Sequence, residues 1–162
     1  MFASNTSTLV LLAKIGCLED FINISPIIEM PEQVKREALF DQDSYYARLI
    51  QKLIDNKKII PMPIKTTKII DIMSQFRLDE GEAAAYALFD DKRHKAILTD
   101  DGVLIKLCKL EKIPFVCAMA VVIRLFEKKK LSKEMALSRL ENLHEIGRYS
   151  KGLYEHFKSE VK

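Results

Sequence analysis

Short apolar runs alternate with longer stretches of helical periodicity along the chain. The segments between the runs repeat apolar residues at helical spacing, and the pattern from residue 118 onward predicts three more helices. Alternating strands and helices are typical of an α/β fold whose mostly parallel sheet is covered on both faces. The expected strands are Met1–Ala3, Pro26–Met30, Ile59–Met62, Ala96–Thr99 and Ile113–Val116.

Polar residues mark where several of the predicted helices begin. Asp79 and Glu82 have the spacing of a capping box, in which each side chain binds a backbone N–H of the other. Asp100 is a candidate cap for the following helix, and Asn5 or Thr6 for the first one. Each of these residues therefore has a structural interpretation as well as a chemical one.

Composition and charge narrow the class of protein. The chain has 162 residues, 48% hydrophobic and 30% charged, which favours one folded domain over disorder. We expect an α/β core in residues 1–117 and a helical part in residues 118–162. The net charge of +3 comes entirely from residues 127–162, which is typical of a solvated helical face or of a contact with nucleic acid.

Several classes of site and location are disfavoured. The longest uncharged apolar run, residues 115–123, is far shorter than the ~20 residues of a membrane span. No secretory signal pattern is present. We therefore expect a cytoplasmic protein without a membrane partner. No phosphate-binding glycine loop or dinucleotide motif occurs. We expect reduced, buried cysteines at Cys17, Cys108 and Cys117, and surface histidines without zinc spacing at His94, His144 and His156.

Acidic and hydroxyl residues follow two of the predicted strands. Residues 4–7 come after the first strand, and residues 99–101 after the fourth, while Glu37 and Glu82 lie on helices beside them. Ligands of parallel sheets bind beyond the carboxyl ends of the strands, so these side chains can share one cleft. Clustered carboxylates repel one another, and a hard cation such as Mg²⁺ or Mn²⁺ relieves that repulsion. Such a cation polarises a phosphate oxygen and activates water.

The same residues carry a resemblance to a known family. The chain resembles the PIN domain (PilT N-terminal) nucleases, and most of all a prokaryotic, toxin-like branch of them. The order and spacing of the motifs hold along residues 1–117, and the C-terminal helices match more weakly. The matching segments are Ala3–Val10 with Leu12–Gly16, the Pro-x-x-Val-x-x-Glu block Pro31–Glu37, the Gly-Glu-Ala block Gly81–Ala85, and Thr99–Asp101.

The resemblance implies a fold, an activity and a set of site residues. It implies a three-layer α/β/α sandwich of Rossmann-like topology and a Mg²⁺- or Mn²⁺-dependent ribonuclease that hydrolyses phosphodiester bonds in single-stranded RNA. It also implies RNA and an antitoxin protein as partners, and we expect a homodimer. Carried over by motif, the catalytic residues are Glu37, Glu82, Asp100 and Asp101, the metal ligands are Asn5, Glu37, Glu82 and Asp101, and Asn5, Thr6, Ser7 and Thr99 position substrate or water.

One position departs from the family pattern. Most PIN nucleases have Asp where this chain has Asn5, which keeps an oxygen ligand but removes a negative charge. The alternatives to a nuclease are therefore a non-catalytic PIN-like module that binds RNA or protein through a weakened metal site, and a purely structural dimerisation domain.

Overall fold

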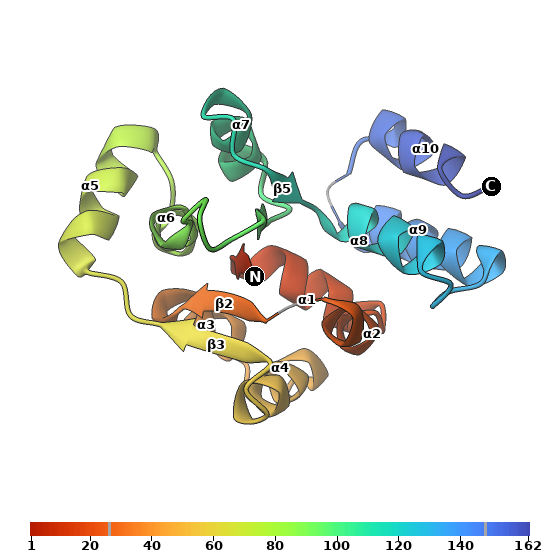
Figure 1. The fold of residues 1–162 in the computed structure, drawn as a ribbon, viewed down its shortest axis with the longest axis horizontal. Helices are drawn as coiled ribbons and strands as arrows, with labels where there is room; N and C mark the ends of the chain where they lie inside the picture. Colours follow the sequence, from red (N-terminus) through yellow and green to blue (C-terminus); the bar gives the residue numbers. More distant parts are fainter. Residues whose placement is uncertain (26, 148) are drawn as a thin grey trace.

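The computed structural model describes residues 1–25, 27–147 and 149–162. A five-stranded, all-parallel sheet forms its centre, in the order β3-β2-β1-β4-β5 (Figure 1). The strands are β1 (Phe2–Ser4), β2 (Ile28–Pro31), β3 (Ile59–Met62), β4 (Ala96–Leu98) and β5 (Phe115–Val116).

Helices cover both faces of the sheet. The buried apolar residues of α1, α2, α4, α8 and α9 form one core, and those of α5, α6 and α7 form a second core on the other face. Helix α3 adds Val34 and Ala38 to the first core and contacts both α1 and α6. The helices are α1 (Thr6–Lys14), α2 (Leu18–Ile24), α3 (Glu32–Ala38), α4 (Tyr45–Asp55), α5 (Thr66–Phe76), α6 (Glu80–Leu88), α7 (Gly102–Leu110), α8 (Ala118–Glu127), α9 (Lys133–Ile146) and α10 (Lys151–Ser159).

The order of the strands creates a switch point beside β1. The chain runs outward from β1 through β2 to β3 and then returns to place β4 on the other side of β1. Ser4 pairs with Leu98, so the residues that follow β1 and β4 emerge side by side at the carboxyl end of the sheet. A crevice at this point is the usual ligand site of an open parallel sheet.

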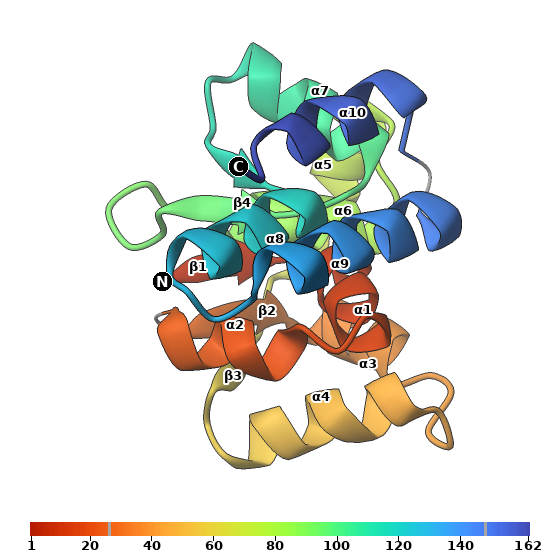
Figure 2. The ribbon, with the colours of Figure 1, turned by 90° about the vertical axis from the view of Figure 1, so that its right-hand side faces the viewer.

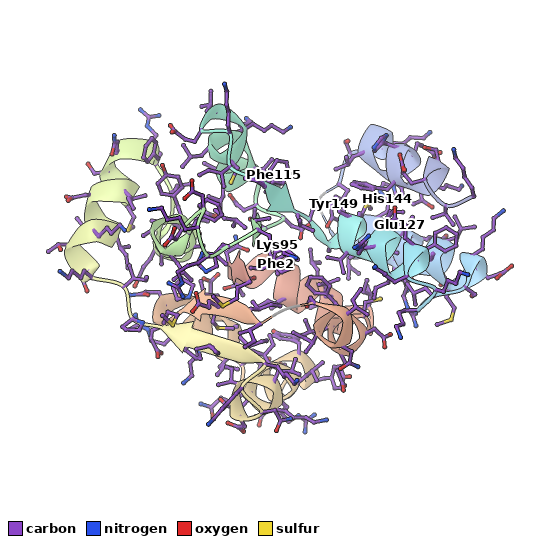
Figure 3. All side chains as sticks on the ribbon, in the orientation of Figure 1. Phe2, Lys95, Phe115, Glu127, His144 and Tyr149 are labelled. Atoms are coloured by element: carbon purple, nitrogen blue, oxygen red, sulfur yellow. The ribbon has the colours of Figure 1, made fainter. Side chains whose placement is uncertain are left out.

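The C-terminal helices add a wall to this arrangement. Helices α8 and α9 pack against each other on the same face as α1, and α10 contacts both (Figure 2). Tyr149, which precedes α10, lies near β5 and the start of α8 (Figure 3).

The fold class predicted from the sequence is confirmed: the architecture is a three-layer α/β/α sandwich. All five expected strands and the three C-terminal helices are present, with boundaries shifted by one or two residues. Pro26, placed in the second expected strand, lies outside the described residues. The three cysteines are free and buried as predicted, and burial raises the pKa of each thiol to about 11. Within the described parts of the chain, no helix combines the length and the apolar character that crossing a bilayer requires.

Candidate active site

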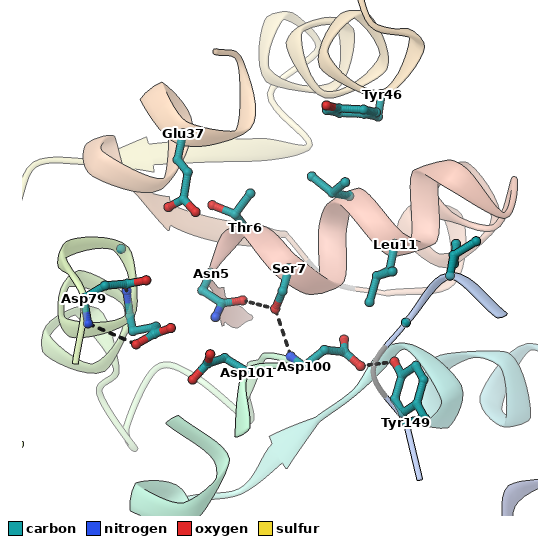
Figure 4. A pocket seen from close by; sticks show the side chains of 15 residues that line it. Asn5, Thr6, Ser7, Leu11, Glu37, Tyr46, Asp79, Asp100, Asp101 and Tyr149 are labelled. Carbon is teal, nitrogen blue, oxygen red and sulfur yellow. Dashed lines mark hydrogen bonds between the residues drawn. The ribbon is translucent and has the colours of Figure 1, made fainter. Parts of the chain in front are cut away.

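A cleft of about 690 Å³ opens at the carboxyl ends of β1 and β4 (Figure 4). Its walls come from the start of α1, the end of α3, the first turn of α6, the β4–α7 junction and the segment after α9. Seven of the eight site residues expected from the sequence line it, and the eighth, Thr99, is fully buried behind it. The seven are Asn5, Thr6, Ser7, Glu37, Glu82, Asp100 and Asp101.

The Asn5 amide bridges the ends of the two central strands. Its Oδ1 accepts a hydrogen bond from the Ser7 hydroxyl at 2.9 Å, and its Nδ2 donates to Thr99 Oγ1 at 2.8 Å. Those hydroxyls in turn accept the backbone N–H groups of Asp100 (2.9 Å) and Asp101 (3.1 Å). Asn5 is the N-cap residue of α1, but its side chain makes no capping hydrogen bond. The side chain therefore orders the acidic loop after β4 rather than the helix after β1.

Glu82 and Asp101 form a pair of facing carboxyl groups. Glu82 Oε2 accepts the N–H of Asp79 at 3.0 Å and Asp79 Oδ1 accepts the N–H of Glu82 at 2.8 Å, which confirms the capping box. Burial, together with the hydrogen bond and the charge of Asp101, raises the pKa of Glu82 to about 8. Near neutral pH Glu82 therefore keeps its proton when no cation lies beside it.

Helix α7 begins differently from the expectation. Its N-cap is Asp101, whose Oδ1 accepts the N–H of Leu104 at 2.8 Å, so the assignment of this cap to Asp100 was wrong. The helix starts one residue later than the sequence pattern indicated, because the Asp100 carboxyl group is engaged elsewhere.

The Asp100 carboxyl group is held by three donors from distant parts of the chain. Thr8 Oγ1 donates to its Oδ2 at 2.6 Å, the backbone N–H of Ala118 donates at 3.0 Å, and the Tyr149 hydroxyl donates to Oδ1. Burial raises the pKa of Asp100, although these donors act in the opposite direction. Asp100 thus lines the cleft but joins α1, α8 and the C-terminal segment. Thr8 lies in the Ala3–Val10 segment that carries the resemblance but was given no role there, and Tyr149 stood in no motif.

Glu37 reaches the cleft from the penultimate position of α3 and faces Thr6 (Figure 4). Its Oε2 lies 2.5 Å from the point that a Cβ on Gly81 would occupy, so glycine is needed there for this approach. Burial raises the pKa of Glu37 and the charges of Asp79 and Glu80 add to this effect, whereas the Thr6 hydroxyl opposes it.

The donor set of the cleft suits a cation held by few protein ligands. Among residues 1–25, 27–147 and 149–162, no three His, Cys, Asp or Glu side chains converge closely enough to enclose an ion. Mg²⁺ is commonly bound through one or two carboxylates together with water and substrate phosphate. The Glu82–Asp101 pair, in which burial and the nearby charge of Asp101 raise the pKa of Glu82, fits that mode of binding. The larger ligand set that includes Asn5 and Glu37 stays a prediction.

The comparison with known families agrees with this geometry. A family model described as DUF3368, a PIN domain, matches residues 1–162. The chain is a PIN domain. PIN domains are typically nucleases and usually use divalent metal ions. Neither the curated proteins nor the solved structures contain a match to this PIN domain.

A second charged cluster lies at the opposite end of the sheet in this PIN domain. Glu29 on β2 is buried, and its carboxylate accepts hydrogen bonds from Arg93 at 2.5 and 2.6 Å. His94 Nδ1 accepts the N–H of Asp90, so Nε2 carries the proton and donates to Glu29 at 2.7 Å. The expectation that His94 lies on the surface was wrong, because a buried carboxylate requires buried partners. The signal in the sequence was Glu29 itself, a charge within an apolar strand.

Proposed function

We propose that this PIN domain is a Mg²⁺- or Mn²⁺-dependent ribonuclease that hydrolyses phosphodiester bonds in single-stranded RNA. The observation that carries the proposal is the assembly of Glu37, Glu82 and Asp101 in one cleft at the switch point of the sheet. The raised pKa values of Glu37 and Glu82 support it, because they reflect carboxyl groups that a cation would stabilise in charged form.

In this proposal the protein side chains bind the ion and orient the reacting groups. A bound divalent ion supplies positive charge to the phosphate and acidifies a water molecule. Glu82 and Asp101 would hold the ion, with Glu82 in its charged form. Glu37, on the opposite wall, accepts a hydrogen bond from the water that attacks phosphorus. The Asn5 amide keeps the loop of Asp101 in register through Thr99.

The test is metal-dependent cleavage of a fluorescent single-stranded RNA by the full chain, combined with Mn²⁺ titration by calorimetry. Glu82→Gln should abolish cleavage and weaken Mn²⁺ binding. Glu80→Gln is the matched control, since it makes the same change two residues away, at an exposed position that faces Arg36 at 3.5 Å. Equal Mn²⁺ binding and cleavage in the parent and Glu82→Gln would refute the proposal, as would a parent that cleaves no RNA.

One observation favours the alternative of a non-catalytic module. Both polar atoms of the Asn5 amide are already hydrogen-bonded within the protein, to Ser7 and to Thr99. In this alternative the cleft binds RNA or a protein without hydrolysis. RNA binding that persists in EDTA, with no cleavage at any Mn²⁺ concentration, would establish it.

The biological setting is part of the proposal as well. We propose that the ribonuclease is the toxin of a toxin–antitoxin pair, acts in the cytoplasm and forms a homodimer. Growth arrest on expression of the parent, and its absence with Glu82→Gln, would support the toxin role. Sedimentation of the purified chain measures the oligomeric state.

A further inference from the structure

The cleft has two chemically different ends. One end carries the carboxyl groups of Glu37, Glu82 and Asp101, where the metal ion is proposed to bind. The other end is apolar, and Figure 4 shows Tyr46 and Leu11 there, on the side away from Asp79. Both ends belong to one continuous cavity, so a ligand bound to the carboxylates extends into the apolar part.

Three helices build this apolar arm of the cleft. Val10 and Leu11 come from α1, Tyr46 comes from α4, and Ile146 ends α9. Ile146 is 49% exposed, so this part of the arm is open to solvent. The hydroxyl of the neighbouring Tyr149 is already bound to Asp100. The arm therefore offers apolar and aromatic surface with few free polar groups.

A cation stands beside the aromatic ring of the arm. The Lys14 ammonium group, on the last turn of α1, lies 5.4 Å from the centroid of the Tyr46 ring. Lys14 is exposed, and its charge is free to contact an anion bound at the rim of the cleft. The cleft thus carries carboxylates and an apolar arm with Tyr46, and the Lys14 ammonium group stands beside that tyrosine.

We propose that the apolar arm is a nucleobase subsite, in which an unpaired base of the substrate RNA stacks on Tyr46 while Lys14 contacts the adjoining phosphate. This inference rests on the proposed function, since it takes the scissile phosphate to lie at the acidic end. Nucleotides alternate a flat apolar base with an anionic phosphate, which matches the sequence of surfaces along the cleft. A base in a duplex has both faces covered by its neighbours, so only single-stranded RNA fits the arm.

The arm also sets the expected selectivity of the subsite. Stacking on an aromatic ring accepts every base, and sequence preference arises mainly from hydrogen bonds to base edges. Val10, Leu11 and Ile146 offer no side-chain hydrogen bonds to such edges. The subsite should therefore require a base but discriminate little between bases, with purines favoured by their larger stacking area.

The experiment measures binding of a fluorescent single-stranded RNA in EDTA and its cleavage with Mn²⁺, for the full chain and three variants of α4. Tyr46→Leu should weaken RNA binding by about ten-fold, the scale of losing one stacked base. Tyr46→Phe should stay close to the parent because it keeps the ring. Tyr45→Leu is the matched control, since Tyr45 is 59% exposed and does not line the cleft.

Further readouts separate stacking from a structural role of Tyr46. An RNA with one abasic residue beside the scissile phosphate should bind the parent and Tyr46→Leu equally. Mn²⁺ binding should be unchanged in Tyr46→Leu, and its KM should rise with little change in kcat. If Tyr46→Leu melts at a lower temperature, Lys14→Gln at the exposed end of α1 provides the independent test, and it should weaken binding and reduce its salt dependence.

The outcomes for the subsite and for the nuclease are distinct. Parent-like RNA binding by Tyr46→Leu, or an equal loss with Tyr45→Leu, overturns the subsite even when the protein cleaves RNA. Weaker binding by Tyr46→Leu without cleavage by any variant supports the subsite and overturns the nuclease. A parent that binds no single-stranded RNA overturns the subsite directly.

Discussion

Replacing Glu82 by Gln should stabilise the metal-free protein at alkaline pH and leave it unchanged at acidic pH. The folded protein raises the pKa of Glu82 from 4.5 to about 8, so between these values it binds more protons than the unfolded chain. Stability of the parent must then fall as the pH rises through this window. Gln has no charge to lose, and its amide oxygen can still accept the N–H of Asp79, so the capping box survives.

The magnitude follows from the shift and from the exposure of the cleft. Each pKa unit corresponds to about 1.4 kcal/mol. The cleft is open to water, and solvent screening reduces the effect. We therefore expect the free energy of unfolding of the parent to fall by about 1–2 kcal/mol between pH 5 and pH 8.5. Glu82→Ala, which removes the capping box as well, should cost about 0.5–1 kcal/mol at pH 5.

The assay is thermal and urea unfolding of the metal-free parent, Glu82→Gln and Glu80→Gln across that pH range. Glu80→Gln should follow the parent, because Glu80 is exposed and lies outside the pair with Asp101. Mn²⁺ binding by the parent should tighten with rising pH over the same window, because Glu82 loses its proton there. A parent whose stability does not vary with pH, or a Glu82→Gln protein that melts below it at pH 8.5, would refute the reasoning.

Three further substitutions test other parts of the cleft. Gly81→Ala should displace the Glu37 carboxylate and lower RNA cleavage. Its free energy of unfolding in urea should stay level or rise by up to about 1 kcal/mol, because alanine favours the helix. A marked loss of stability would show that the backbone had moved instead. Asn5→Asp should lower the melting temperature of the metal-free protein, because it adds a carboxylate and removes the donor to Thr99. The same change should tighten Mn²⁺ binding in calorimetry. No change in either quantity would show that Asn5 takes no part in the metal site. Asp100→Asn should lower the free energy of unfolding in urea by about 2–3 kcal/mol, since the Asp100 carboxyl group accepts three hydrogen bonds. A parent-like value would show that these hydrogen bonds do not stabilise the fold.

Much of the fold could be predicted because its elements are local. Five apolar runs separated by helical periodicity were enough to predict a parallel sheet. The capping box of Asp79 and Glu82 is also local, since it depends only on a spacing of three residues. The residues at which the strands begin and end could not be predicted in this way, because pairing with neighbouring strands decides them.

The candidate site was predictable only as a set of positions. Motif order placed Glu37, Glu82 and Asp101 at one end of the sheet, and the structure brings them into one cleft. The hydrogen bond that orders the acidic loop was not predictable, because it joins Asn5 to Thr99, 94 residues further along the chain. Such contacts depend on the register of β1 against β4, for which the sequence pattern carries no signal.

The three-donor arrangement around Asp100 has a consequence for how the molecule opens. Helix α10 has no buried residue of its own, so it belongs to the parts of the fold that unfold locally at the lowest free energy. Tyr149 precedes this helix directly and donates to Asp100 in the cleft. In native-state hydrogen exchange we expect the amides of α10 to exchange long before those of the sheet. An opening event that also frees Tyr149 would remove one of the three donors to the Asp100 carboxyl group, so that local unfolding of the last helix is coupled to the charge presented to a ligand in the cleft.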